Sequence, residues 1–558
     1  MSFDFLRRRE WIWLVVMAAL FLALRLPAVY SPYHQDEYKW VQYSHPEITP
    51  PGTVPHPPLT EFIYAKTLGP LLGDGNFRFV PLIFGFINLF LVFQLTKIIF
   101  DKKSALWATF LFSASFFSVL ASLMVDVDGA VMPMFFLIMS LGYLRLKRTN
   151  FQFSIFNFLI LLIGAVGGFM VKVSGILPVL ALFLDYLIEK GAFSDKKRIL
   201  KYAGFGALGF LGFALILLAA RFVFPFFNLE YSLKYWKHFA DSSSFLGRGW
   251  LQTFIQFAKA MLYSSPLLVL PAFMIDREIW RKARPFFLFI FGGLAFYLFA
   301  FDFSLGALDR YLQFLVIPLS IISGAVFARH FSGKLVRSDV ISVSIIGVSV
   351  FVLQFFNHFV PALHPKTEWI SRILSLKWNF LYPFSGGSGP IPFYVSFLFM
   401  ALIWGVTVVF LLASLKMKNI KERGLFLILV LGLVYNAAFI EEYAFGKING
   451  SSSKLVNESV EFIKSNPQIK KVIVYNDNGG WNVRETGKYE RRMYATPDFE
   501  PTYREALKDF NGHILLINAP RIQEGSFYTG YFKSSCKTEY YQENRYITAE
   551  IMKCRPLK

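Results

Sequence analysis

The sequence predicts an all-α polytopic membrane domain, residues 1–440, followed by a small soluble α/β domain, residues 441–558. Of the 558 residues, 55% are hydrophobic and 18% are aromatic, and the mean hydropathy is +0.46. This composition excludes a wholly soluble globular protein. Long apolar segments recur up to about residue 440, whereas short apolar runs and frequent Asp, Glu, Asn and Lys follow Glu441. The change in composition marks the boundary between the two domains.

Thirteen apolar segments come close to the length of about 20 residues that a membrane-spanning helix needs. We expect spans at residues 11–29, 79–99, 104–125, 129–146, 151–171, 174–188, 202–227, 253–275, 286–301, 312–328, 340–360, 393–415 and 424–439. No small-residue cleavage site follows the first segment, so we interpret it as a retained helix and not as a signal peptide.

The formal charge of +20 reflects membrane topology and does not indicate a nucleic-acid partner. If the N-terminus is cytoplasmic, the inner loops hold 25 Lys and Arg, and the longer outer loops before the C-terminal domain hold eleven. The positive-inside rule therefore predicts a cytoplasmic N-terminus, and thirteen crossings place the C-terminal domain outside the cell. The expected outer loops are residues 30–78, 228–252 and 361–392.

The C-terminal domain alternates helix-like and strand-like segments and ends in a predicted hairpin. Residues 458–465 and 502–510 are helix-like, and each precedes a strand-like segment, at 471–475 and 513–518. Cys536 and Cys554 lie symmetrically about Arg545, where the hairpin would turn. On an oxidising face this position permits a disulfide, and the alternative is two separate thiols.

The first outer loop holds the residues that most resemble an active site. It has about fifty residues, and loops of that length are usually functional or disordered. Asp36 and Glu37 follow the first span, where partial desolvation suits a carboxylate to general-base catalysis. The alternative is that they cap a solvated helix. His56 lies further along this loop, and Arg78 stands at the start of the second span.

Two further groups of charged residues lie at predicted outer boundaries. Asp126 and Asp128 form a D-x-D pattern that can chelate a hard divalent cation or, alternatively, bond to helix N-terminal amides. Lys172 stands in a minimal hairpin between two spans, and Arg310 with Tyr311 opens the tenth span. Cations at the outer boundary can bind a lipid phosphate, and the alternative is that they snorkel to the membrane surface.

The order and sidedness of these motifs resemble the membrane glycosyltransferases of the GT-C superfamily. Within it, the sequence is most similar to the protein O-mannosyltransferase and lipid A aminoarabinose transferase branch, glycosyltransferase families 39 and 83, best over residues 1–227. The resemblance implies that Asp36 is the catalytic base, with Glu37 beside it. It implies that His56, Arg78, Lys172, Arg310 and Tyr311 bind the donor phosphate, with Asp126 and Asp128 near that phosphate or a metal. The Trp-Trp-Asp motif of oligosaccharide ligases does not occur in the C-terminal domain.

We therefore expect an enzyme of a prokaryotic cytoplasmic membrane that transfers one hexose or pentose with inversion. The donor would be a polyprenyl-phosphate-linked sugar, and the acceptor a lipid, glycan or protein on the extracytoplasmic face. Membrane lipids are the other expected partners; no nucleic acid is expected, and a divalent cation is the one cofactor considered. The alternatives are a transporter or lipid flippase, with intramembrane charges around a midplane site, and a non-catalytic scaffold with an outer binding domain.

Overall fold

The protein was examined as a computed structural model, which describes residues 8–152, 154–241, 249–300, 310–333, 336–363, 367–385, 390–417 and 420–557. The chain forms two compact units. The first unit comprises Met1–Leu26, Trp40–Lys334 and Phe410–Leu429, and the second comprises Pro27–Lys39, Leu335–Val409 and Val430–Lys558.

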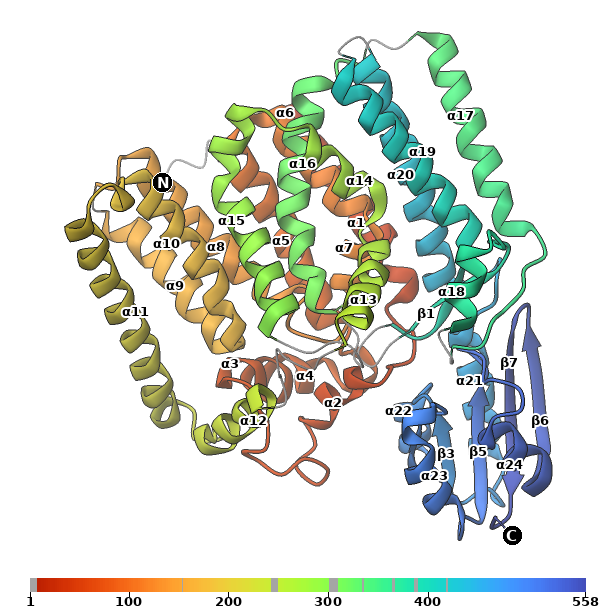
Figure 1. The fold of residues 1–558 in the computed structure, drawn as a ribbon. Coiled ribbons are helices and arrows are strands. Elements are labelled where there is room, and N and C mark those ends of the chain that lie inside the picture. Colours follow the sequence, from red (N-terminus) through yellow and green to blue (C-terminus); the bar gives the residue numbers. More distant parts are fainter. Residues whose placement is uncertain are drawn as a thin grey trace. The chain divides into compact units, whose positions relative to one another are not determined.

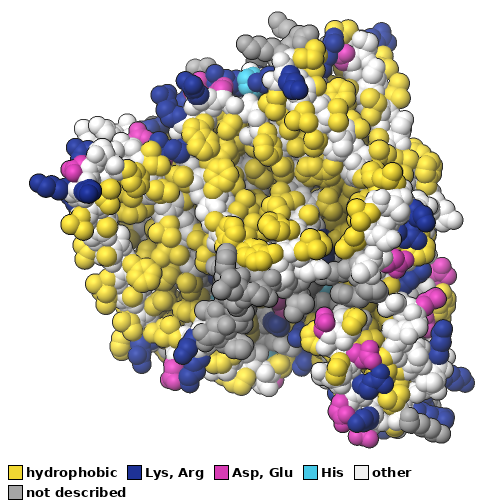
Figure 2. Space-filling view, in the orientation of Figure 1, with side chains coloured by type: hydrophobic (Ala, Val, Ile, Leu, Met, Phe, Trp, Pro, Cys, Tyr) yellow, Lys and Arg dark blue, Asp and Glu magenta, His cyan; other side chains and the backbone are white. Residues whose placement is uncertain are grey.

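The first unit is a bundle of α-helices (Figure 1). Its helices are α1 (Arg8–Ala23), α3 (Pro58–Glu61), α4 (Leu68–Leu72), α5 (Phe79–Ile99), α6 (Lys102–Ala114), α7 (Phe116–Ala121), α8 (Val131–Arg148), α9 (Ile155–Val171), α10 (Ile176–Glu189), α11 (Lys196–Val223), α12 (Leu229–Asp241), α13 (Trp250–Tyr263), α14 (Ser265–Val269), α15 (Arg277–Ala300) and α16 (Val316–His330). The 3-10 segment η7 (Arg310–Leu315) precedes α16. Figure 2 shows hydrophobic side chains over the visible face of these helices, as expected for helices in lipid.

Eight helices of the described residues are long and apolar enough to cross a membrane, or nine if one bent pair is counted as a single span. This finding confirms a polytopic helical protein but not the predicted number of thirteen spans. The predicted span 104–125 breaks at Ser115, between α6 and α7, and the helix ends at Ala121. The predicted span 253–275 bends by 92° between α13 and the segment Ser265–Met274.

Close packing of α8 against α9 fixes the region where the candidate site lies. A Cβ on Gly164 of α9 would lie 2.3 Å from the backbone nitrogen of Met139 in α8, and a Cβ on Gly142 would lie 2.5 Å from that of Leu161. Small residues at helix interfaces allow this close approach in membranes. The close contact aligns the end of α9 with the loop that precedes α8.

The second unit contains a mixed five-stranded sheet with helices on both faces, which confirms the predicted α/β domain (Figure 1). The strand order is β4-β3-β5-β7-β6; β3 pairs in parallel with β4 and β5, and β7 pairs antiparallel with β5 and β6. Its elements after residue 440 are α21 (Ser452–Ser465), β3 (Val472–Tyr475), α22 (Gly480–Glu485), β4 (Tyr489–Met493), α23 (Glu500–Leu507), β5 (Gly512–Ile517), α24 (Phe527–Ser535), β6 (Cys536–Asn544) and β7 (Ile547–Cys554). The strands form two apolar layers, one with α21 and one with α23 and α24.

The remaining elements of the second unit precede this sheet. They are α17 (Arg337–Val352), α18 (Thr367–Leu374), the antiparallel pair β1 (Leu381–Phe384) and β2 (Phe393–Ser396), α19 (Phe397–Lys416) and α20 (Lys421–Ala444); α19 and α20 contribute residues to both units. The predicted outer loop 361–392 thus contains α18 and β1, and its residues 364–366 and 386–389 lie outside the described part of the chain, as do residues 242–248 of the loop 228–252.

Cys536 and Cys554 form a disulfide that joins the first residue of β6 to the last residue of β7, at the open end of the hairpin. The two residues face each other in the strand register, with their Cα atoms 4.0 Å apart. The sequence left open a disulfide or two separate thiols, and the structure has the disulfide.

Candidate active site

The loop between α7 and α8 holds two buried carboxylates. Asp126 and Asp128 are only 3% and 2% exposed. Asp126 Oδ1 accepts hydrogen bonds from the backbone nitrogens of Val127 and, at 3.2 Å, of Asp128, so the side chain fixes the turn of its own loop. Buried carboxylates are costly unless they are paired with cations and hydrogen-bond donors.

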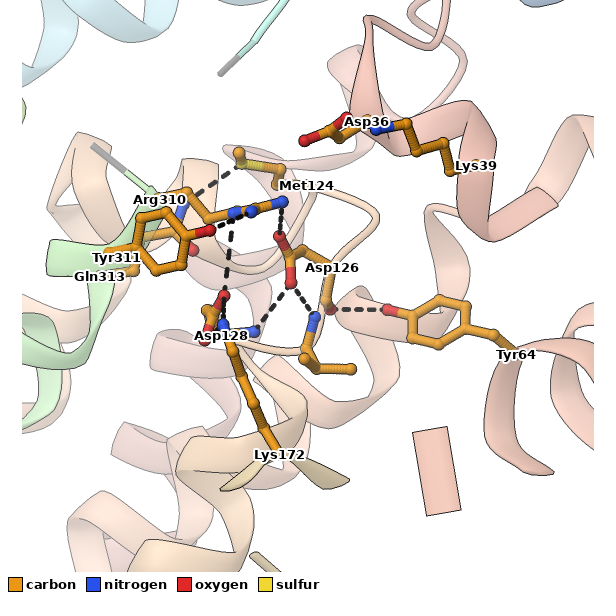
Figure 3. A network of polar contacts seen from close by, with 11 residues as sticks. Asp36, Lys39, Tyr64, Met124, Asp126, Asp128, Lys172, Arg310, Tyr311 and Gln313 are labelled. Carbon is orange, nitrogen blue, oxygen red and sulfur yellow. Dashed lines mark hydrogen bonds and ion pairs between the residues drawn. The ribbon is translucent and has the colours of Figure 1, made fainter. Parts of the chain in front are cut away.

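Lys172 and Arg310 supply the cations for these two carboxylates (Figure 3). Lys172 Nζ lies 2.7 Å from both carboxylate oxygens of Asp128. Arg310 Nη1 lies 3.0 Å from Asp126 Oδ2, and its Nε lies 3.8 Å from Asp128 Oδ2. The structure therefore brings together four of the predicted site residues, which we call the ionic quartet.

Three separate elements build the ionic quartet. Lys172 caps the C-terminal end of α9, the two aspartates precede α8, and Arg310 begins η7. Gly129 allows the loop to pass close to η7, because a Cβ there would lie 2.5 Å from Gln313 Oε1 and 2.2 Å from the backbone oxygen of Ala121.

Tyr311 completes this side of the site. Its hydroxyl accepts a 2.6 Å hydrogen bond from Arg310 Nη2. Its ring also faces Lys172, with Nζ 4.7 Å from the ring centroid, a distance suited to a cation–π interaction. Tyr311 therefore contacts both cations of the quartet.

The charges of the quartet balance one another. Burial raises the pKa of Asp126, but Arg310 and Lys172 outweigh this effect and hold it below its ordinary value. Burial lowers the pKa of Lys172, but the nearby Asp128 outweighs this effect and raises it. Both groups lie between helices. Burial and the neighbouring Asp126 raise the pKa of Asp128, and Lys172 and Arg310 offset this rise only in part.

The residues of the loop are a poor fit for the divalent cation considered from the D-x-D pattern. The two carboxylates already bind Lys172 and Arg310, and in the described part of the chain no cluster of three or more His, Cys, Asp and Glu could hold a metal. Hard divalent cations usually take six or more oxygen ligands in proteins. We derive no step through a metal.

Arg78 lies behind the loop. Its side chain is 1% exposed, and Nη1 donates a 2.9 Å hydrogen bond to the backbone oxygen of Leu123. Tyr64, which the sequence reasoning missed, donates a 2.7 Å hydrogen bond to the backbone oxygen of Asp126. Both side chains hold the backbone that carries the two aspartates.

The ring of Trp40 lies between His56 and Tyr64. His56 stacks on Trp40, with the ring centroids 5.2 Å apart, and Trp40 lies 5.1 Å from the ring of Tyr64. The rings of Trp40 and Tyr64 thus connect His56 to the loop. Neither residue belongs to a motif in the sequence.

Arg25 is a second residue that supports this region. It is fully buried, and it donates hydrogen bonds to Ser122 Oγ at 2.6 Å, to Ser118 Oγ at 3.0 Å and to the backbone oxygen of Ser113 at 3.0 Å. These partners lie on either side of the break between α6 and α7 and at the start of the loop. In the sequence, the signal for this role of Arg25 was its position as a charged residue inside the first apolar segment.

Asp36 and Glu37 belong to the second unit. They open the short helix α2 (Asp36–Gln42), where Glu37 is 2% exposed and accepts a 3.0 Å hydrogen bond from the backbone nitrogen of His34. Asp36 retains 25% exposure of its side chain and pairs with Lys39. Glu37 therefore fixes the turn that leads into the helix, and Asp36 presents the more accessible carboxylate.

The segment before α2 is joined to the loop after β3 in the same unit. His34 Nε2 donates a 3.1 Å hydrogen bond to the backbone oxygen of Asn476, and Tyr38 is hydrogen-bonded to Asp477. Residues 34 and 478 also form an isolated β-bridge. No sequence motif indicates this connection, because 442 positions separate His34 from Asn476 in the chain.

Comparison with known proteins points to membrane glycosyltransferases. A family model for dolichyl-phosphate-mannose-protein mannosyltransferases matches residues 55–218, the part that holds Arg78, Asp126, Asp128 and Lys172. Comparison with proteins of curated function finds no match.

Two solved structures share the fold. The chain is similar to ArnT from Cupriavidus metallidurans bound to undecaprenyl phosphate, with a TM-score of 0.54 and 11% identity over 98% of each chain. For the apo state of that protein the TM-score is 0.53, with 12% identity over 97% of this chain and 98% of the other. The family match and these two likenesses confirm the predicted GT-C resemblance and fold.

Proposed function

We propose that the protein is an integral-membrane glycosyltransferase that moves one sugar from a polyprenyl-phosphate carrier to an acceptor on the extracytoplasmic face. The observation that carries the proposal is the ionic quartet, in which two cations stand at a helix end and at the start of a candidate span. The matched family model is named for a dolichyl-phosphate sugar, and the ArnT structure holds undecaprenyl phosphate. The acceptor is a lipid, a glycan or a protein.

Lys172 and Arg310 would bind the donor phosphate. The ammonium has three donors and the guanidinium five, so each cation can bind phosphate oxygens while it keeps one contact to a carboxylate. The aspartates hold the two cations in place and balance their charge before the phosphate binds. In the transition state the cations would stabilise the charge that develops on the leaving phosphate.

Asp36 would act as the general base in a single displacement. The acceptor oxygen forms a bond to the anomeric carbon while the bond from that carbon to the phosphate oxygen breaks. The hydroxyl proton passes to the Asp36 carboxylate, and the electron pair of the broken bond leaves with the phosphate, so the anomeric configuration inverts. Glu37 is a positioning residue, because it fixes the turn that leads into the helix that carries Asp36.

The alternative of a transporter or lipid flippase requires ionisable groups around a midplane site. Arg25 is the buried charge that fits this requirement best. It donates hydrogen bonds to serine hydroxyls and backbone oxygens on both sides of the helix break, which favours a supporting role over a transport site. We therefore favour the enzyme.

The membrane orientation is part of the proposal. A cytoplasmic N-terminus in a prokaryotic inner membrane would place the C-terminal domain outside the cell. Labelling of Ser465→Cys in intact cells with a membrane-impermeant maleimide tests this orientation, because Ser465 is at the exposed end of α21. If Ser465→Cys is labelled only after lysis, the C-terminal domain faces the cytoplasm and the proposed orientation is wrong.

Sugar transfer by the purified chain in lipid nanodiscs tests the proposed reaction. Wild type, Asp36→Asn and Lys172→Met would be assayed with radiolabelled polyprenyl-phosphate sugars and membrane extract as acceptor. Glu47→Gln, on the same outer loop as Asp36, and Lys190→Met serve as matched controls. We expect transfer by the wild type and both controls, and a loss of at least a hundredfold in both site variants. If the wild type consumes no donor, the transporter or scaffold interpretation replaces the enzyme.

A further inference from the structure

The carboxyl end of β3 lies at a topological switch point of the C-terminal sheet. The chain passes from β3 to β4 on one side, and the next strand, β5, pairs with β3 on its other side. In open α/β sheets, ligands bind outside the carboxyl ends of parallel strands at such a point. A small hollow lies here, lined by residues that include Tyr475, Asn476, Tyr494, Thr496 and Arg521.

Two residues with positive φ set the shape of the loop that follows β3. Asn476 and Asp477 have φ of 50° and 59°, in the left-handed region that asparagine and aspartate adopt more readily than other residues with a side chain. The Asp36 segment contacts this loop, because His34 and Gln35 both hydrogen-bond to Asn476.

Lys39, the partner of Asp36, is one cation of this region, and Arg492, near the end of β4, is another. Arg492 Nη1 lies 3.9 Å from Asp477 Oδ2, and its guanidinium carbon lies 5.3 Å from the ring centroid of Tyr494. Burial lowers the pKa of Arg492, but Tyr494, Tyr38, Asp477 and also Asp36 are close enough to raise it. Asp477, the residue after Asn476, thus connects Arg492 to the segment that carries Asp36, because Gln35 is hydrogen-bonded to Asn476.

The charged groups of this cluster differ in their accessibility. Asp477 is fully buried, whereas the side chains of Arg492 and Asp36 are 38% and 25% exposed. The buried carboxylate holds the guanidinium from behind, and the Asp36 carboxylate and the Arg492 guanidinium remain accessible to a ligand. This arrangement pairs an exposed hydrogen-bond acceptor with an exposed donor.

We propose that Arg492 and Tyr494 form the acceptor subsite next to Asp36 and that this subsite recognises a neutral, hydroxyl-rich sugar ring. This inference rests on the proposed function of Asp36. A hydroxyl group both donates and accepts, so neighbouring hydroxyls of one ring can bond to Asp36 and to Arg492 together. The charges of the cluster already balance, because Lys39 pairs with Asp36 and Arg492 with Asp477, so the cluster has no surplus positive charge for a phosphate or carboxylate on the acceptor. The geometry therefore favours a neutral glycan over an anionic acceptor.

A binding measurement tests the subsite without requiring transfer. Saturation-transfer NMR on the full chain in nanodiscs would compare neutral methyl glycosides of hexoses and pentoses with glycerol 1-phosphate. We expect signals from at least one methyl glycoside with wild type, and their loss in Arg492→Gln and Tyr494→Leu. The control Arg504→Gln changes an exposed arginine of α23 that pairs with Glu500 and should keep the signals. Stronger signals from glycerol 1-phosphate than from every glycoside, or equal signals in all variants, would overturn the proposal.

A kinetic measurement then separates this proposal from that of the enzyme. With a neutral oligosaccharide fraction of the membrane extract as acceptor, Arg492→Gln should raise the acceptor KM at least tenfold and leave the donor KM unchanged. Arg492→Lys should recover part of the loss. A change in the donor KM alone would contradict an acceptor subsite, whereas absence of transfer by the wild type would contradict the enzyme and leave the NMR result to decide the subsite.

Discussion

Gln35 donates a hydrogen bond of 3.1 Å from Nε2 to Asn476 Oδ1, although 441 residues separate them in the chain. Gln35 directly precedes Asp36, and Asn476 directly follows β3. The proposed base is therefore held in place by the C-terminal domain and not only by the first outer loop. If Asp36 is the base, this connection would give the domain a part in catalysis that its composition alone did not indicate.

The first prediction concerns the ion pair between Lys172 and Asp128. Lys172→Met leaves a buried carboxylate without its cation and should reduce stability by about 3–5 kcal/mol. The double variant Lys172→Met with Asp128→Asn should recover most of this stability and none of the activity, because the phosphate still lacks its ligand. Thermal unfolding in detergent and sugar transfer measure the two effects. Recovery of transfer in the double variant would contradict the role of Lys172.

Close packing of α8 against α9 gives the second prediction. A Cβ at Gly164 would lie 2.3 Å from the backbone nitrogen of Met139, so Gly164→Ala should push α9 away and displace Lys172 from Asp128. We expect a lower unfolding temperature and at least tenfold slower transfer. Gly204→Ala is the matched control, because no atom lies within 4 Å of the added Cβ in α11. Equal behaviour of the two variants would show that the α8–α9 contact does not position the site.

The third prediction concerns the disulfide between Cys536 and Cys554. It cross-links two residues with a sequence separation of 18. A disulfide across a loop of that size stabilises the folded protein by about 3 kcal/mol. The double variant Cys536→Ala with Cys554→Ala should lower the unfolding temperature of the protein. Addition of a reductant should lower it for wild type but not for the variant, and an unchanged wild type under full reduction would contradict the prediction.

The sequence predicted the residue types of the site better than their partners. Asp126, Asp128, Lys172 and Arg310 were each recognised from their position at an outer boundary, but their mutual pairing depends on the close approach of α8 and α9, which periodicity cannot show. Charged residues near apolar segments are visible in a sequence, and their contacts across a bundle are not.

Aromatic and backbone partners were missed for a similar reason. Trp40 and Tyr64 are two of many aromatic residues in this chain and carry no motif, although their rings connect His56 to the Asp126 backbone. The helix pattern also could not show where an apolar segment breaks, and the number of thirteen spans is not confirmed. An apolar stretch such as residues 104–125 continues through the break at Ser115, where Arg25 satisfies the backbone oxygen of Ser113.

Asp477 gives the last prediction, a pH dependence of stability. Burial raises its pKa from 3.8 to about 6, although Tyr38 and Arg492 oppose the change. A carboxyl whose pKa is higher in the folded state binds a proton more tightly there, so its contribution to stability is complete below pH 3.8 and is lost as the pH rises through 6. The shift corresponds to up to about 3 kcal/mol. Asp477→Asn should remove this loss, so its unfolding temperature should change less between pH 4 and pH 7 than that of wild type or of the control Glu490→Gln. An equal change in all three proteins would show that Asp477 ionises normally, and that burial does not govern the carboxylate behind Arg492.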